Sequence, residues 1–588
     1  MIRRSPRRGI SFRGSSPEPV MPRSFPASRC SSLFLLSLLA LPGAAFAQAP
    51  AQNEEPGQER AIDAPIISNE GLTQTQRIRH VLSRFAFGPT PGLVEEVRKI
   101  GLEKWFEKQL AGGVSSDYAL TERLRQYETL QMSPKEYLAW VRSLRDKLPK
   151  KRKPKDNRIL NSARNKMRGE VKDYVLWQAI YSRHQMLETC SDFFRNHFSV
   201  ESAKGAVRYF IADWEKSVIR AGALGKFGDL LEASAKHPAM LVYLDNAVSR
   251  RPPSKAELNK LKARVRVRTR SKERAEESVE IAKQRGLNEN YARELLELHT
   301  LGVDNYYKQR DVIELAKVLT GWTVDGNPER KTFGFRFRQD MHVRGDKYVL
   351  GRRYRTQSGE SAIREGERFL RFLVGHPGTA HFISWKLCRH FVRDEPSDAM
   401  VERIAQVFQK SKGDLPSVYR AIFRDPEFFS PDNFQSKFKR PFEFIVSALR
   451  VTGAEVKDLS GVRRALMALS EPLYECLDPT GYYDQAEAWK DPGVMAIRWQ
   501  FAIQLARGRI PGVKIPESFY EDLHPRIPNA WKDQLARKIL PVSMGDKTSA
   551  VIDSMIRSQL ERRPRARPSD LGPLIVGMLL GSPEFQRQ

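Results

Sequence analysis

The chain has 588 residues, 40% of them hydrophobic and 29% charged, and a formal net charge of +29 at pH 7. This composition fits a soluble globular protein, and its length exceeds what one hydrophobic core usually supports, so two or more sub-domains are expected. Beyond the N-terminal segment the cysteines are Cys190, Cys388 and Cys476, which is too few for a disulfide-stapled scaffold or a cysteine-rich zinc site.

The N-terminus has the layout of a signal peptide. Residues 31–47 form a short apolar run that ends in small residues and follows Arg23 and Arg29. We expect residues 1–47 to be removed after Ala47, with translation starting at Met21 as an alternative. The protein is therefore predicted to be exported, to the periplasm or outside the cell. The arginine pair at 7–8 lies far from the apolar run, and both Sec and twin-arginine export stay open.

Residues 48–71 are rich in Pro, Gln and Glu and are predicted to be a flexible lead-in. From Leu72 to the C-terminus the pattern is that of amphipathic helices, interrupted by two basic insertions near 142–172 and 251–285. The first contains thirteen Lys/Arg against three Asp/Glu, and the second twelve against five. Such runs indicate either a contact with an anionic surface or a solvated, partly disordered insertion. Neither contains aromatic residues to stack bases, so nucleic acid is not expected as a partner.

Strand signals are confined to one region. Residues 332–338 alternate phenylalanine with glycine or arginine, which is typical of a half-buried strand, and 346–351 is the predicted partner. The predicted fold is therefore mainly α, a multi-helix globular protein with one small β-hairpin at about 332–351.

The segment 290–301 reads as an amphipathic helix. Its apolar face collects Tyr291, Ala292, Leu295, Leu296 and Leu298. The opposite face carries Asn290, Arg293, Glu294 and Glu297. Asn288 or Asn290 can cap the start and Gly302 can end the helix.

Two further features of this region are predicted from the same pattern. His299 falls on the apolar side of the 290–301 helix, where we expect a hydrogen-bonded core histidine. In the next helix, Asp311 and Glu314 have the spacing of a capping box before a buried stripe.

Several stretches together resemble the DUF1800 family (domain of unknown function 1800) from about Leu72 to the C-terminus. They occur in family order at residues 80–110, 193–200, 227–249, 287–303, 311–324, 375–392, 437–450 and 581–586. The resemblance implies an exported, largely helical bacterial protein whose molecular activity is uncharacterised. It also implies a partner, because members are commonly encoded beside exported, sulfatase-like DUF1501 proteins.

The sequence departs from the family pattern at two places. The family usually has an aromatic residue where this chain has His299, which makes His299 a poor catalytic candidate. Around the β element the family reads His-Asp, but here Val343 follows His342, while Lys347 is retained. A His-acid pair at this place would need Asp340 or Asp346.

The polar residues within these stretches are the candidate site residues. The catalytic candidates are His197, Asp245, Glu294, Glu297 and His342. The binding candidates are Asn288, Asn290, Arg293 and Lys347. Carboxylates with one or two histidines could hold a divalent metal or act as acid and base, but no spacing matches a known metal or nucleophile signature, so the cofactor stays unknown.

Two functions are compatible with the sequence. The first is a non-catalytic helical platform in the envelope or outside the cell, acting with a partner exported protein of the DUF1501 kind or with an anionic glycan or envelope surface. The alternative is a metal-assisted or carboxylate/His-based hydrolase of an envelope or extracellular polymer. In a platform, each candidate residue would form a helix cap or a local ion pair. In a hydrolase, the candidates would converge on one concave pocket.

Overall fold

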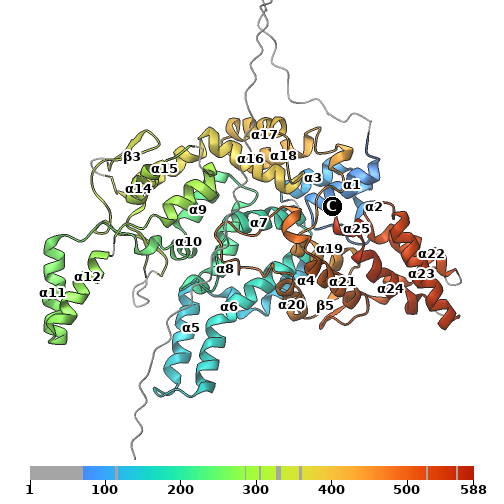
Figure 1. The fold of residues 1–588 in the computed structure, drawn as a ribbon, viewed down its shortest axis with the longest axis horizontal. Helices are drawn as coiled ribbons and strands as arrows, with labels where there is room; N and C mark the ends of the chain where they lie inside the picture. Colours follow the sequence, from blue (N-terminus) through green and yellow to red (C-terminus); the bar gives the residue numbers. More distant parts are fainter. Residues whose placement is uncertain are drawn as a thin grey trace, which may run out of the picture. The chain divides into compact units, whose positions relative to one another are not determined.

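The chain is mainly α-helical, as predicted (Figure 1). The computed structural model describes residues 71–588 except 113–116, 285, 304–305, 326–332, 357–359, 525–526 and 565–566. The predicted signal peptide and residues 48–70 of the predicted lead-in lie outside the described residues. No helix in the described part is long and apolar enough to cross a bilayer.

Twenty-five α-helices follow one another in the described residues. The first ten are α1 (Gln74–Arg84), α2 (Leu93–Ile100), α3 (Leu102–Leu110), α4 (Tyr118–Arg125), α5 (Pro134–Lys147), α6 (Pro154–Tyr181), α7 (Gln185–His197), α8 (Ile211–Asp213), α9 (Phe227–Lys236) and α10 (Pro238–Tyr243). The next eight are α11 (Lys255–Thr269), α12 (Lys272–Gln284), α13 (Asn290–Leu296), α14 (Gln309–Leu319), α15 (Ile363–Val374), α16 (Pro377–Phe391), α17 (Asp398–Lys410) and α18 (Leu415–Arg424). The last seven are α19 (Pro441–Val451), α20 (Ser460–Ala468), α21 (Pro492–Ala506), α22 (Pro528–Ile539), α23 (Asp546–Arg562), α24 (Pro568–Gly581) and α25 (Pro583–Gln586).

Shorter elements connect these helices. Two are π-helical, η3 (Trp214–Arg220) and η5 (Glu297–Leu301). The 3-10 turns are η1 (Glu128–Gln131), η2 (Val207–Tyr209), η4 (Asn246–Val248), η6 (Pro431–Asn433), η7 (Ala486–Trp489) and η8 (Glu517–Tyr520). The strands are β1 (Trp322–Val324), β2 (Phe335–Phe337), β3 (Lys347–Val349), β4 (Arg352–Tyr354), β5 (Glu455–Val456) and β6 (Val513–Lys514).

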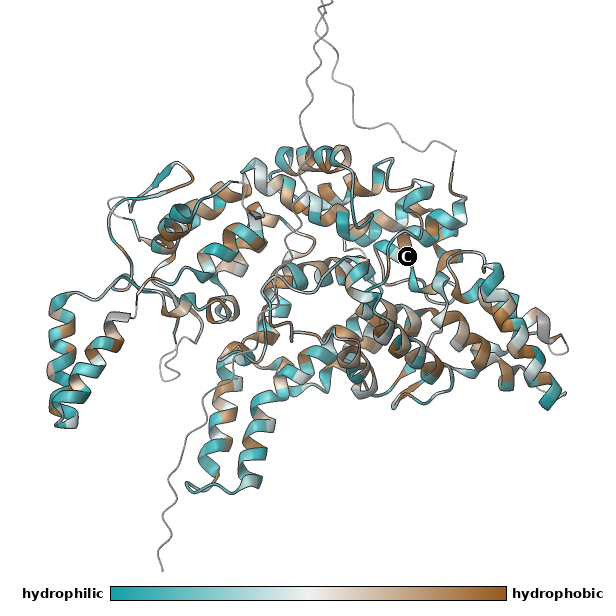
Figure 2. Ribbon diagram, in the orientation of Figure 1, coloured by the Kyte–Doolittle hydropathy of each residue, from teal (hydrophilic) through white to brown (hydrophobic). Residues whose placement is uncertain are grey.

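The core is continuous along the chain. Every residue of α19 is buried, so this helix is surrounded on all sides. One cluster of buried hydrophobic side chains extends from Ile78 in α1 to Phe585 in α25. Figure 2 shows α24 as largely hydrophobic, whereas α11 is mainly hydrophilic. The described residues from Gly71 onward belong to a single compact unit, so the expectation of two or more sub-domains from length alone was wrong for them.

The segment 290–301 folds as predicted in its main features. Tyr291, Ala292, Leu295 and Leu296 are all fully buried. The Asn288 side-chain oxygen accepts a hydrogen bond from the Asn290 amide at 2.9 Å and so caps the start. The last turn widens into the π-helix η5, and Gly302 ends it with a φ of 82°.

The start of α14 differs from the prediction. The helix begins at Gln309, and Asp311 is its third residue, where its carboxylate accepts the Lys308 amide at 2.9 Å. The predicted capping box of Asp311 and Glu314 was therefore wrong. Both carboxylates instead bind the amides of β3 and the turn after it, Glu314 that of Tyr348 at 3.1 Å and Asp311 that of Leu350 at 2.7 Å.

The predicted hairpin at 332–351 was wrong in its pairing. Strands form at 335–337 and 347–349, but β2 pairs with β1 and β3 pairs with β4, both antiparallel. The reason is local: Leu350 and Gly351 have φ values of 50° and 72°. They form the two-residue turn that favours a tight hairpin with the very next residues.

Both basic insertions fold into helix pairs. The first supplies the end of α5 and the start of α6, and the second supplies α11 and α12 (Figure 1). Val265 and Ala275 are buried in the second pair, whereas Val267 is 81% exposed. The segment leaves and re-enters the body at one point, because the Arg250 amide donates to the Gly286 carbonyl at 3.2 Å. The solvated character was predicted correctly for the second insertion only, because Leu160, Met167 and Val171 of the first belong to the core; the helices were not predicted.

Gly321 allows β1 to follow α14 directly. Its φ is +85°, and a Cβ at this position would lie 2.6 Å from the Arg338 carbonyl oxygen. We expect Gly321→Ala to lower the free energy of unfolding by about 2–4 kcal/mol, measured by urea denaturation, because strain and a backbone clash add.

Gly345 is the matched control, since its φ is +93° but no atom lies within 4 Å of its built Cβ. Gly345→Ala should cost only the strain, about 1–2 kcal/mol. Equal losses in the two variants would contradict the steric explanation for Gly321.

Candidate functional site

The structure divides the nine candidate residues among three groups. His197 lies in the core beside His299. Asp245, Asn288 and the polar side of α13 surround one turn of the chain. His342 and Lys347 meet in a separate buried cluster. Each group has its own local partners.

His197 is the last residue of α7 and is 2% exposed. Its Nε2 lies 3.3 Å from the His299 carbonyl oxygen, and the two imidazole rings are 6.0 Å apart. Burial holds the pKa of both histidines low, that of His299 at about 3, and the nearby Lys386 acts in the same direction. Both are neutral at pH 7. His299 is buried as predicted, but its ring nitrogens have no hydrogen-bond partner among the described residues.

Asp245 forms a turn with a φ of 60°, and its carboxylate lies 2.8 Å from Lys204 Nζ. The Asn288 side-chain amide donates to the Asp245 carbonyl at 3.4 Å, and the Asn288 backbone amide donates to Ser249 Oγ at 3.1 Å. Asn288 therefore ties this turn to the start of α13, which is a structural role.

The polar side of α13 is half-exposed. Arg293 donates to Gln309 Oε1 at 2.7 Å and lies 3.7 Å from Glu289. The Tyr307 hydroxyl donates to Glu297 at 3.4 Å. Glu294 is the one unusual group here: burial first, then the negative charges of Glu297 and Asp478, raise its pKa to about 7, against the effect of Arg293.

His342, Lys347 and Glu365 form a fully buried cluster. Lys347 Nζ lies 2.7 Å from a Glu365 carboxylate oxygen and 3.1 Å from His342 Nε2. On its other side His342 Nδ1 contacts the Thr320 carbonyl at 2.8 Å. Burial would raise the pKa of Glu365, but hydrogen bonds from His342, Lys347 and Thr356 lower it to about 2. The carboxylate stays charged.

The acid beside His342 is therefore Glu365, a residue that sequence reasoning missed. Asp340 lies instead in an exposed ion pair with Arg338, and Asp346 lies 3.5 Å from Arg355. The expectation that Asp340 or Asp346 replaces the family acid was wrong. Glu365 comes from α15, and only the fold reveals its proximity.

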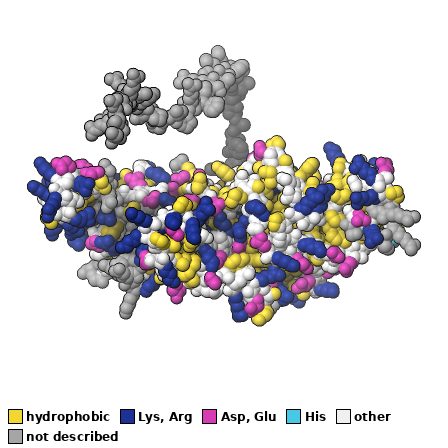
Figure 3. Space-filling model, turned by 90° about the horizontal axis from the view of Figure 1, so that it is seen from below, with side chains coloured by type: hydrophobic (Ala, Val, Ile, Leu, Met, Phe, Trp, Pro, Cys, Tyr) yellow, Lys and Arg dark blue, Asp and Glu magenta, His cyan; other side chains and the backbone are white. Residues whose placement is uncertain are grey.

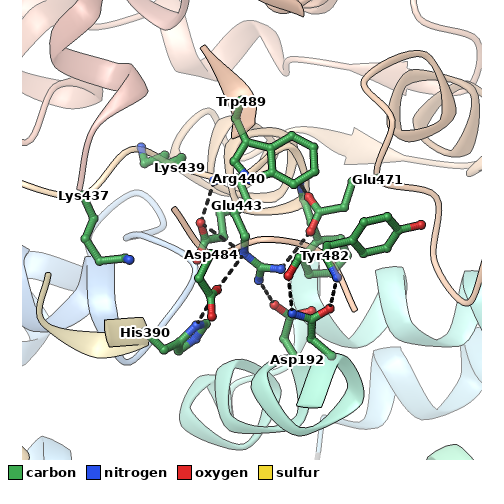
Figure 4. Close-up of polar contacts among 12 residues, drawn as sticks. Asp192, His390, Lys437, Lys439, Arg440, Glu443, Glu471, Tyr482, Asp484 and Trp489 are labelled. Atoms are coloured by element: carbon green, nitrogen blue, oxygen red, sulfur yellow. Dashed lines mark hydrogen bonds and ion pairs between the residues drawn. The ribbon is translucent and has the colours of Figure 1, made fainter. Parts of the chain in front are cut away.

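A larger buried charge network surrounds Arg440, just before α19 (Figure 4). The Arg440 guanidinium contacts Asp192 from α7, Glu471 at 2.8 Å and Asp484 at 3.5 Å. Its backbone amide donates to the Glu443 carboxylate at 2.7 Å. The Arg440 side chain is only 3% exposed, so carboxylates replace the water that this cation loses.

The network continues into the neighbouring helices. Arg195 donates to the Asp192 carboxylate at 3.1 Å. It also donates two hydrogen bonds, of 2.9 and 3.0 Å, to the Glu215 carboxylate of η3. His390 Nδ1 of α16 lies 3.3 Å from Asp484. Charge therefore joins five segments that are distant in sequence: α7, η3, α16, the start of α19 and the loop from Glu471 to Asp484.

The carboxylates of this network differ in protonation. Burial raises the pKa of Glu471 to about 7, and Asp192 acts in the same direction while Arg440 opposes it. Burial would also raise the pKa of Asp484, but His390 and Arg440 hold it far below its ordinary value. A cavity of about 30 Å³ adjoins the network, lined in part by Asp192, Glu471 and Tyr474, which is room for about one water molecule.

Sequence reasoning missed this network, although its residues lie in or beside stretches already singled out. Arg195 belongs to 193–200, His390 to 375–392, and Arg440 to 437–450. Charged residues that recur inside otherwise apolar helical segments were the available signal. Among the described residues, no group of three His, Cys, Asp or Glu side chains is arranged to hold a metal ion. Cys190, Cys388 and Cys476 are free thiols.

The fold and these clusters define a helical protein with a charge-linked core and short antiparallel strand pairs. The family model described as "Protein of unknown function (DUF1800)" matches residues 80–587, and the chain belongs to this family. No curated protein and no solved structure shows a significant match to it.

We expect Arg440→Met to lower the free energy of unfolding by about 3–5 kcal/mol, because it leaves buried carboxylates without their cation. Urea denaturation followed by circular dichroism measures the loss. Arg424→Met is the control, since Arg424 forms a 2.9 Å ion pair with Glu103 in which both side chains are about half exposed. It should cost at most about 1 kcal/mol. A small loss for Arg440→Met would contradict a stabilising role.

Glu365 should make stability depend on acid pH. Its pKa is lowered from the ordinary 4.5 to about 2, so its contribution is complete above pH 4.5 and is lost as pH falls toward 2. The melting temperature of Glu365→Gln should therefore fall less than that of the wild type between pH 5 and pH 2.5. Glu360→Gln, in a more exposed pair with Arg368, should follow the wild type. Parallel profiles of wild type and Glu365→Gln would refute the assignment.

Proposed function

We propose that the protein is an exported, non-catalytic helical platform that binds an acidic polysaccharide of the envelope. Export rests on the signal-peptide layout of residues 1–47. The binding role rests on the exposed cationic surface of α11, which is the observation that carries the proposal.

The candidate catalytic residues favour the platform over a hydrolase. His342 is enclosed by Lys347 and Glu365, and Asp245 is paired with Lys204. Asn288 is used to cap α13. These contacts are the local ion pairs and caps that a structural role requires, and they divide the candidates among separate clusters.

The cationic surface lies on one stripe of α11. Lys260, Arg264 and Arg268 are spaced four residues apart, so they lie one above the other on the helix. All three are exposed, and within the described residues their side chains have neither an ion pair nor a hydrogen bond. In contrast, Lys262, which faces α12, lies 3.3 Å from Glu276.

Like charges at this spacing repel one another and weaken an isolated helix. A polymer with repeated carboxylates would neutralise these three cations together. Its negative charge is also opposite in sign to the net +29 of the full-length chain. Figure 3 shows that Lys and Arg are more abundant than Asp and Glu on the face displayed.

The test is binding of polygalacturonate, with neutral dextran as the control polymer. The triple variant Lys260→Gln, Arg264→Gln, Arg268→Gln should bind about tenfold or more weakly than the wild type, and binding should weaken with salt. Arg464, Arg507 and Arg509 are also exposed. Changing these three to Gln alters the net charge equally and should preserve binding. Equal losses in both variants would refute a specific α11 surface.

Glu294 favours the hydrolase as the second candidate, because a carboxyl with a pKa of about 7 suits a general acid and Glu297 lies beside it. Mixtures of the protein with polygalacturonate also distinguish the binding platform from the hydrolase. Release of reducing ends from polygalacturonate by the wild type, lost in Glu294→Gln but kept in Glu289→Gln, would replace the platform by a hydrolase.

A further inference from the structure

A pocket of about 430 Å³ opens between the N-terminal and C-terminal helices of the described unit. It is lined by α1, α2, α19, η8, α22 and α25 and the loops beside them. Its apolar wall includes Val94, Val451, Phe519, Leu540 and Phe585. The size is typical of a small-molecule site. None of the nine candidate residues lines this pocket.

Lys439 lines the pocket and is the unusual group in it. It is 5% exposed, yet its ammonium forms no ion pair with any described carboxylate. Lys439 Nζ donates to the Phe585 carbonyl at 2.8 Å and lies 3.8 Å from the centre of the Phe585 ring. An ammonium has three N–H donors, so two remain for another acceptor.

Arg79 adds a second cation whose partners are neutral. It donates to the backbone carbonyls of Arg537, at 2.9 Å, and of Leu540, and its Nε has no partner among the described residues. The acidic residues that line the pocket are committed elsewhere: Asp522 pairs with Lys538 and Glu95 pairs with Arg98.

The pocket therefore combines an apolar wall with a buried cation that lacks a counterion. A buried charge without a partner is costly, and an incoming anion would relieve that cost. We propose that this pocket binds a small amphiphilic carboxylate, with its carboxylate on Lys439 and its apolar body against Val451, Phe519 and Phe585.

Isothermal titration calorimetry with decanoate tests the proposal, with decanol as the uncharged probe of the same length. Wild type should bind decanoate and bind decanol about tenfold or more weakly, because a charge-assisted hydrogen bond is lost. Lys439→Met should remove this preference. Burial lowers the pKa of Lys439 to about 7, with Arg498 acting in the same direction and Glu443 opposing it. The ammonium is therefore lost as pH rises, and decanoate should bind more weakly at pH 9 than at pH 6.

Two further variants separate binding from folding. Arg424→Met removes a half-exposed cation that does not line the pocket, and it should leave decanoate binding unchanged. Val94→Trp fills the half-exposed side of the pocket and should abolish binding of both probes without loss of helix content. Failure of wild type to bind decanoate, or equal binding by wild type and Lys439→Met, would overturn the proposal.

Discussion

A buried arginine surrounded by carboxylates is the constraint on which the rest of the structure depends. Arg440 precedes the fully buried helix α19, so its guanidinium cannot reach water. The carboxylates of Asp192, Glu471 and Asp484 take the place of water; Asp192 comes from α7, and the other two lie at the ends of one loop. Because a buried charge without partners is so unfavourable, the arginine requires these segments to be in place together.

The buried charges around Arg440 also influence the polar side of α13, where part of the site was predicted. The loop between Glu471 and Asp484 is fixed at both ends by Arg440, and its middle lies beside Tyr243, whose hydroxyl donates to the Leu477 carbonyl at 3.0 Å. Asp478 on this loop is one of the charges that raise the pKa of Glu294. The half-exposed acids of α13 therefore depend on the buried network for their surroundings, although they do not belong to it.

Sequence patterns predicted the structural features that depend on residues close to one another along the chain. The apolar face of 290–301 and its Asn288 cap follow from the sequence pattern. The cap was confirmed, and so was the face as far as Leu296, but Leu298 is only partly buried because the helix becomes π-helical from Glu297. The strands at 335–337 and 347–349 were located, but their partners were not, because the turn at Leu350–Gly351 decided the pairing.

The clusters of candidate site residues also depend on contacts between distant segments, which sequence patterns do not predict. His342 was singled out, but its acid partner Glu365 lies on another helix, and no spacing in the sequence points to it. The Arg440 network draws on five segments that only the folded chain brings together. The helical insertions were missed for a different reason: their charge indicated solvent, and charge alone does not distinguish a solvated helix pair from a disordered loop.

The two ends of the insertion that contains α11 and α12 meet where the Arg250 amide donates to the Gly286 carbonyl, and beside them the Arg251 amide donates to the Met341 carbonyl. A segment whose ends meet can be gained, lost or exchanged during evolution without moving the rest of the polypeptide. Its surface can therefore diversify while the charge-linked interior, which tolerates little change, is inherited intact.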